Sequence, residues 1–290
     1  MTARRAIALA AVALALAGCD LAGTREPQAP PSPAMWEVTS PAGDKAWLLG
    51  SMHALASGTK WRTPAFDAAF AQSGALVLEV AELADPQKLG DAFERLAVSP
   101  GQGLVSSRVP AADRARVIET IEDAGYDDDD FRALETWAVA LTLSSELNET
   151  GVGVDRQLLE ERGSRPLHGL ETVADQYGAF DGLSAQDQAA LLVAVVQEAD
   201  RPQDRSARAE AWRLGDLETL EQETHRGMLA DPEIRQALLV ARNAEWIDDI
   251  ERLVASGERP MIVVGTGHVV GKEGIPALLE ARGYTLRRVQ

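Results

Sequence analysis

Apolar positions along the chain predict strands near both of its ends. The segments 35–40 (MWEVTS) and 45–51 (KAWLLGS) flank the turn sequence PAGDK and predict a hairpin, and the apolar run 74–80 predicts another buried strand. Near the other end, the run 261–264 predicts a buried strand, and the final segment IPALLEARGYTLRRV predicts a helix and a short last strand. We therefore expect a mixed α/β (α+β) fold whose central mixed sheet contains strands from both chain ends.

The middle of the chain has helical periodicity. Apolar residues recur at helical spacing in the segments 111–126, 131–147 and 183–199, and Ser184 is placed to cap the last of these helices. We expect this largely helical middle to cover one crevice of the sheet.

The first residues have the layout of a secretory signal. Two arginines precede an apolar run that is too short to span a membrane, and the sequence Leu-Ala-Gly-Cys at 16–19 resembles the lipobox of bacterial lipoproteins. We predict a signal peptide at 1–18, lipidation of Cys19, a proline-rich tether at 19–34 and one domain at 35–290. The alternative is a signal peptide that is cut elsewhere. In both cases we expect the protein to be located in the cell envelope. Lipidation would anchor it to a bacterial membrane, facing the periplasm or the exterior.

Composition excludes several classes of function. Cys19 is the only cysteine, so a lipidated chain has no thiol for disulfides, zinc ribbons or a cysteine nucleophile. The formal net charge of −17 argues against nucleic acid as a partner, because the phosphate backbone attracts basic surfaces.

Two of the four histidines follow predicted strands at the same offset. His53 lies three residues after Gly50, and His268 lies three residues after Gly265. Open sheets bind ligands outside the carboxyl ends of their strands, and glycine permits close backbone approach there. The repeated spacing makes both histidines candidate ligands, against the plainer interpretation of two ordinary loop histidines. His168 and His225 are interpreted as surface residues.

Four polar residues stand in apolar surroundings. Glu79 ends an apolar strand, Glu171 follows a glycine in an apparent loop, and Arg242 and Asn243 fall on the apolar face of a helix, where Trp246 is placed to support Arg242. A buried charge requires a partner, a proton or a metal ion. A structural ion pair is the alternative for each.

Five segments in order resemble the TraB/PrgY/GumN family, whose relatives include the Tiki-type metalloproteases and, more distantly, erythromycin esterase-like and ChaN-like proteins. The segments cover nearly the whole domain: LLGSMHAL, LVLEV, VGVDRQLLEERGSRPLHGLETVADQ, RNAEWIDDI and VVGTGHVVGKEGIPALLEARGYTLRRV. One departure is Ser51, where the family usually has threonine.

The resemblance implies a divalent-metal hydrolase, a peptidase in the Tiki case. It implies metal ligation by His53, His268 and Glu79, and catalytic roles for Glu79, Arg242, Asn243 and Glu171. Asp155 matches a less central position.

Ordinary coordination chemistry agrees with that implication. Two imidazoles and a carboxylate can hold Zn, Mn, Co or Fe(II), a second carboxylate can take a proton, and an arginine can stabilise an oxyanion. The sequence does not choose the metal. We predict a lipid-anchored, metal-dependent hydrolase acting on a peptide or protein substrate. The alternatives are a non-catalytic binding or regulatory protein of the envelope using the same crevice, and haem or iron handling.

Overall fold

A six-stranded mixed sheet forms the centre of the domain, with the strand order β6-β4-β7-β2-β1-β8. This description is of a computed structural model and covers residues 29–147 and 151–290. The strands are β1 (Met35–Thr39), β2 (Lys45–Ser51), β4 (Ala75–Val80), β6 (Leu167–Glu171), β7 (Pro260–Gly265) and β8 (Thr285–Arg288). The four strands β6, β4, β7 and β2 pair in parallel, whereas β1 is antiparallel to β2 and β8. The predicted sheet from both chain ends is confirmed.

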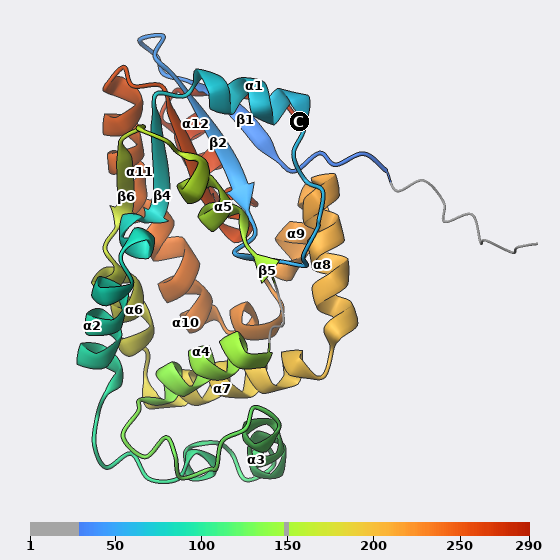
Figure 1. The fold of residues 1–290 in the computed structure, drawn as a ribbon, viewed down its shortest axis with the longest axis vertical. Helices are drawn as coiled ribbons and strands as arrows, with labels where there is room; N and C mark the ends of the chain where they lie inside the picture. Colours follow the sequence, from blue (N-terminus) through green and yellow to red (C-terminus); the bar gives the residue numbers. More distant parts are fainter. Residues whose placement is uncertain (1–28, 148–150) are drawn as a thin grey trace, which may run out of the picture. The chain divides into compact units, whose positions relative to one another are not determined.

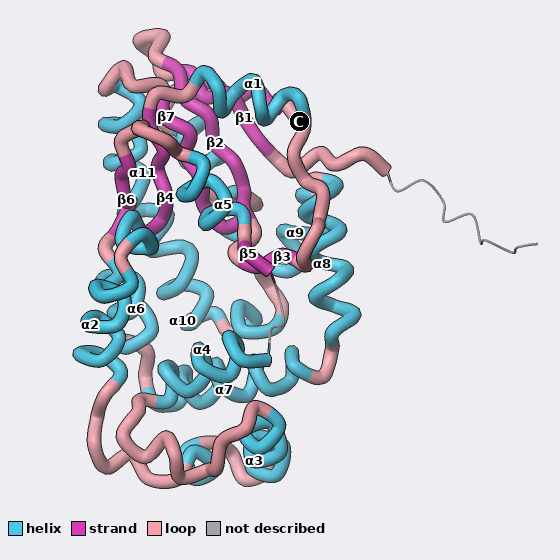
Figure 2. Tube along the Cα trace, viewed as in Figure 1, coloured by secondary structure: helices cyan, strands magenta, loops and turns pink. Residues whose placement is uncertain are grey.

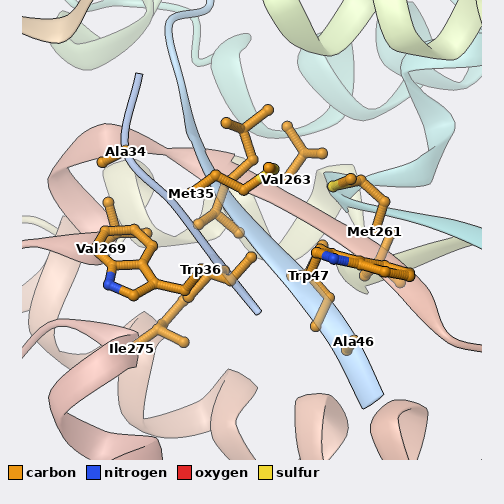
Figure 3. Close-up of a cluster of buried hydrophobic side chains, with 14 of the residues drawn as sticks. Ala34, Met35, Trp36, Ala46, Trp47, Met261, Val263, Val269 and Ile275 are labelled. Atoms are coloured by element: carbon orange, nitrogen blue, oxygen red, sulfur yellow. The ribbon is translucent and has the colours of Figure 1, made fainter. Parts of the chain in front are cut away.

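The interior strands are apolar because both faces of the sheet are covered. β4 and β7 are buried along their whole length. Figure 1 draws α1 (Pro64–Gln72) and α5 (Val154–Glu161) in front of the sheet, and α11 (Ala241–Ala255) and α12 (Ile275–Ala281) behind it. Figure 3 shows one part of this core, where Trp36 lies beside Val269 and Ile275.

The helical middle has a hydrophobic core of its own, separate from the core around the sheet. It lies beyond the carboxyl ends of β2 and β4 (Figure 1). Its helices are α2 (Pro86–Ala97), α3 (Arg114–Asp123), α4 (Thr136–Leu147), α6 (Val173–Asp181), α7 (Ala185–Ala199) and α10 (Pro232–Arg235). Ser184 caps α7 by accepting a hydrogen bond from the Asp187 amide, as predicted.

Two further helices and a small ribbon complete the domain. α8 (Pro202–Leu214) and α9 (Leu217–Glu223) lie between α7 and α10 in the chain, and their residues Trp212 and Leu220 pack in the core around the sheet. β3 (Ala54–Leu55) and β5 (Gly151–Val152) pair antiparallel, apart from the main sheet (Figure 2). Within the described part of the chain, no helix is both long and apolar enough to cross a membrane.

The beginning of the domain is already packed at its first strand. Ala34 and Met35 are buried, and the Ser32 amide donates to the carbonyl of Arg213. The predicted signal peptide, Cys19 and residues 19–28 of the predicted tether lie outside the described residues.

Candidate functional site

The candidate site lies where three neighbouring strands end. β7 is the middle strand of the three, with β2 on one side and β4 on the other. Gly50 of β2 pairs with Val264 of β7, and Ser51 pairs with Gly265, so the two Gly-x-x-His sequences are only one residue out of register. Parallel strands therefore bring both histidines to one edge of the sheet, as the sequence predicted.

Glu79 lies between the two histidines. Its Oε1 atom is 3.8 Å from Nε2 of His53 and 3.7 Å from Nε2 of His268. The same oxygen accepts a 2.6 Å hydrogen bond from the Gly265 amide, and Oε2 accepts a 2.9 Å bond from Arg242. The second residue from the end of a buried strand is thus a rigid position for this carboxylate.

Each histidine is oriented through its other ring nitrogen. Nδ1 of His53 lies 3.0 Å from the Asp155 carboxylate, and Nδ1 of His268 lies 2.6 Å from Oδ1 of Asn243. Both partners are oxygen acceptors, so each Nδ1 carries the proton and the tautomer is inferred from the hydrogen bond. When the rings are neutral, both Nε2 atoms present a lone pair toward Glu79.

Asp155 is positioned by two elements. It lies in the first turn of α5, and Ser51, the last residue of β2, donates to both of its carboxylate oxygens at 3.0 and 3.1 Å. The sequence analysis noted Ser51 only as a departure from the family's usual threonine and did not foresee this contact. An acid in a first helical turn is ordinary, because it suits the helix dipole, so nothing in the sequence marked Asp155 as the partner of His53.

Arg242 joins the two glutamates behind the histidines. It makes two hydrogen bonds to Glu171, at 2.6 and 3.1 Å, as well as the bond to Glu79. Trp246 donates its indole N–H to Glu171 at 3.2 Å, and its ring lies 4.7 Å from the Arg242 guanidinium and 4.6 Å from the His268 ring. The predicted support of Arg242 by Trp246 is confirmed.

Glu171 corrects one expectation about local structure. It was expected in a loop, but it is the last residue of β6 and pairs in register with Val80 of β4. The strand was missed because its exposed Gly169 and half-buried His168 interrupt the apolar pattern.

The electrostatic environment of the site shifts the pKa values of the two histidines in opposite directions. Asp155, with help from Glu79, raises the pKa of His53 to about 10, against the effects of desolvation and of Arg242. Burial, together with Arg242, lowers the pKa of His268 to about 4. The His53 side chain is 62% exposed, so solvent screens part of its interaction with these carboxylates. In the absence of a bound cation, His53 is protonated and His268 is neutral at neutral pH.

The two glutamates also differ. Burial alone would raise the pKa of Glu79, but the charges of the histidines and Arg242 and the Gly265 amide lower it to about 2. At the low pH where Glu79 takes up its proton, His268 and His53 are both protonated, so both imidazoles contribute to this lowering of the Glu79 pKa, with Arg242 and the Gly265 amide. Burial raises the pKa of Glu171, in spite of its bonds to Arg242.

The donor atoms fit a divalent ion in type and nearly in spacing. Within residues 29–147 and 151–290, no three His, Cys, Asp or Glu side chains form a ready-made metal cluster. Two donors of one tetrahedral ion lie roughly 3.4 Å apart, so the separations of 3.7 and 3.8 Å from Glu79 exceed that spacing by a few tenths of an ångström. Gly265 keeps the space open, since a Cβ there would lie 2.9 Å from Nε2 of His53 and 3.2 Å from Oε1 of Glu79.

The other two histidines lie outside this cluster. Nε2 of His168 is 3.0 Å from Glu258, and His225 is exposed just after α9. A surface hollow of about 660 Å³ lies nearby, bounded by Glu171, Gly169, Glu82 and Asp249 among others, but neither His53 nor His268 lines it.

The fold and site define an α/β protein with a His-Glu-His cluster and a buried arginine at the carboxyl ends of parallel strands. The chain belongs to the TraB/PrgY/gumN family, whose model matches residues 34–288. The comparison thus confirms the resemblance and spans every site residue. Searches of curated proteins and of solved structures give no significant match.

Proposed function

We propose that this protein is a divalent-metal-dependent hydrolase of the cell envelope that acts on peptide bonds. The observation that carries the proposal is a charge imbalance. The side chains of Glu79, Glu171 and Asp155 are buried carboxylates, and among the described residues Arg242, which bonds Glu79 and Glu171, is the one buried cation beside them. Two negative charges are left without a buried counter-charge, beside the Nε2 atoms of two imidazole rings that face the centre.

A divalent cation would balance that charge. Buried carboxylates without compensation are costly, and imidazole nitrogen with carboxylate oxygen is the donor set of many hydrolytic metal sites. In the absence of the ion, protonation of His53 supplies part of the missing charge, which is consistent with its raised pKa. A bound ion would supply a water molecule of lowered pKa and polarise the scissile carbonyl.

The residues of the chain then have distinct roles. His53, His268 and Glu79 would hold the ion. Asp155 and Asn243 fix the tautomers of the two histidines, as the partners of metal-binding imidazoles commonly do. His53 is exposed at the edge of the cluster, so a substrate would reach the ion from its side.

Arg242 has a narrower role than the sequence suggested. Three of its bonds go to Glu79 and Glu171, a fourth goes to the Leu238 carbonyl, and the remaining N–H faces His268 at 3.5 Å. A guanidinium has five N–H donors, so Arg242 has none left for a substrate oxyanion. It would act through its charge and by holding the two glutamates.

The use of all the Arg242 donors within the protein favours one alternative function. This is a non-catalytic envelope protein that binds a metal ion or a peptide at the same site. With Arg242 committed to the glutamates, the described site contains no obvious side-chain donor aimed at an oxyanion. Only turnover separates the two possibilities.

The membrane anchor is a second part of the proposal. We propose that Cys19 carries the lipid and that the predicted tether, residues 19–34, links the domain to the membrane, with its last residues packed on the domain. The support is the sequence Leu-Ala-Gly-Cys after a short apolar run.

The test of the function is hydrolysis of a peptide library by the purified full chain, with and without a chelator. We expect cleavage that the chelator abolishes and that Zn, Mn, Co or Fe(II) restores. His268→Gln should remove cleavage, whereas His168→Gln, a histidine away from the cluster, should retain it. Cleavage that resists chelation would refute metal dependence, and metal binding without cleavage of any peptide would favour the binding protein.

A further inference from the structure

The helix that carries Arg242 contains a π-helical turn just before it. The chain runs from α10 through the π-helical turn (Gln236–Val240) into α11, and the junction residues Val240 and Ala241 keep helical backbone angles. The Ala241 amide donates to the carbonyl of Gln236, five residues back. Single π turns inside α-helices are uncommon and are frequently found at functional sites.

The π turn joins two halves of the helix that pack in different cores. Ile234 and Leu238 pack in the core of the helical middle, whereas Trp246 and Ile250 pack in the core of the sheet. In a regular α-helix, Ile234 and Arg242 would be rotated apart by about 80°. The extra residue in a π turn removes about 100° of rotation, which brings both residues close to one face.

The turn also gives Arg242 an acceptor. The Leu238 carbonyl accepts a 2.8 Å hydrogen bond from Nη1 of Arg242. The same nitrogen lies 3.5 Å from Nε2 of His268, which is too long for a good hydrogen bond. One N–H of Nη1 is therefore bonded to the carbonyl, while the other faces the imidazole without forming a good hydrogen bond.

We propose that the π-helical turn is a positioning device, which presents the Leu238 carbonyl to Arg242 and so holds the guanidinium away from Nε2 of His268. The lone pair on Nε2 then stays available for a cation. The benefit for cation binding rests on the proposed function. The position of Arg242 relative to His268 does not, and it can be tested in the metal-free protein.

A regular helix would weaken this restraint. The Leu238 carbonyl would then be aligned with the backbone amide four residues ahead, that of Arg242, as in any α-helix, and would share its lone pairs between that amide and Nη1. Nη1 would be held less firmly and would move toward the nearest other acceptor, Nε2 of His268. The imidazole lone pair would be occupied by a hydrogen bond.

Deletion of Gln236 tests the proposal. Gln236 is exposed and lies in the π turn, so its removal restores the α-helical register without removing a core side chain. Gln236→Ala is the matched control, because it keeps the register. The measurement is the ¹⁵N spectrum of histidine-labelled, metal-free full chain, which contains only four histidines. His268→Gln assigns the His268 signals.

We expect the Nε2 resonance of His268 to move upfield in the deletion variant, as an unprotonated nitrogen does when it accepts a hydrogen bond. Gln236→Ala should match the wild type. Zinc affinity should fall roughly 10–100-fold in the deletion variant alone, the usual effect of disturbing the partners of metal ligands. An unchanged His268 resonance in a deletion variant with native circular dichroism would overturn the proposal.

A second variant decides the matter if the deletion variant does not fold. Replacing Leu239 by its α-hydroxy acid turns the Leu238 carbonyl into an ester carbonyl, a weaker acceptor, and leaves the side chain and register unchanged. The same upfield shift of His268 Nε2 supports the proposal, and its absence overturns it. If the shift occurs but the wild type neither binds metal nor cleaves peptides, the proposed function fails and the positioning role stands.

Discussion

Nε2 of His268 faces Oε1 of Glu79 at 3.7 Å, although neither atom carries a proton to join them. The His268 proton is on Nδ1, where Asn243 accepts it, and Glu79 is ionised. Two electron-rich atoms pointing at one another are unfavourable unless a positive charge lies between or beside them. Arg242 lies beside both atoms, and a divalent cation between them would remove the remaining repulsion.

Glu79 and Glu171 are expected to differ in function, because only Glu79 faces the histidines. Glu79→Gln keeps the shape but removes the charge, and we expect hydrolysis to fall roughly 10²–10⁴-fold. If zinc is lost with it, Glu79 is a ligand, and if zinc is retained, Glu79 is the base. Glu171→Gln should cost roughly 10–100-fold, because Glu171 acts through Arg242. Rates and zinc content of both variants check the assignment, which fails if Glu171→Gln is inactive while Glu79→Gln works normally.

Asp155 should set the orientation of His53. Asp155→Asn leaves a partner for the Ser51 hydroxyl but removes the charge that favours His53 with its proton on Nδ1. We expect zinc affinity to fall roughly 10–100-fold with little change in circular dichroism. Isothermal titration with zinc measures this, and the exposed Asp204→Asn is the control. Equal affinities in the two variants would exclude the role of Asp155.

Gly265 should be required for space at the centre of the site. In Gly265→Ala, the new methyl group would lie 2.9 Å from Nε2 of His53 and should block the approach of an ion. Gly178→Ala is the matched control, since its Cβ would meet nothing within 4 Å in α6, and it should stabilise the fold by about 0.5–1 kcal/mol. Zinc titration and thermal unfolding of both variants check the pair. Normal zinc binding by Gly265→Ala would show that the ion does not sit there.

Cys19 should carry a lipid in the mature protein. Intact-mass analysis should find a diacylglyceryl group on Cys19 as the first residue, and Cys19→Ser should remain unlipidated and uncut at that site. An unmodified Cys19 in the wild type would contradict the anchor while leaving the account of the metal site unaffected.

The strands β2, β4 and β7 could be predicted from the sequence, because their apolar runs are long and those of β2 and β7 end at or next to a glycine. The pairing of His53 with His268 followed from the repeated spacing, since parallel neighbours end at one edge of a sheet. The inward placement of Arg242 and Asn243 followed from the apolar face of their helix, and both are buried.

Other parts of the site depend on tertiary contacts that no local pattern records. Asp155 meets His53 only because α5 packs over the sheet about a hundred residues further along the chain. β6 was missed because it is short and interrupted by polar residues. The π turn was not foreseen. Apolar residues on one face of a helix recur every three or four residues, and one extra residue changes that pattern too little to be recognised in the sequence.

The most direct test of the central claim is the metal content of the purified full chain, measured by mass spectrometry of the elements after dialysis against zinc. The account predicts about one tightly held ion per chain in the wild type and in His168→Ala. It predicts none in the variant with both His53→Ala and His268→Ala, with circular dichroism largely unchanged. Full occupancy in that double variant, or no bound metal in the wild type, would contradict the account.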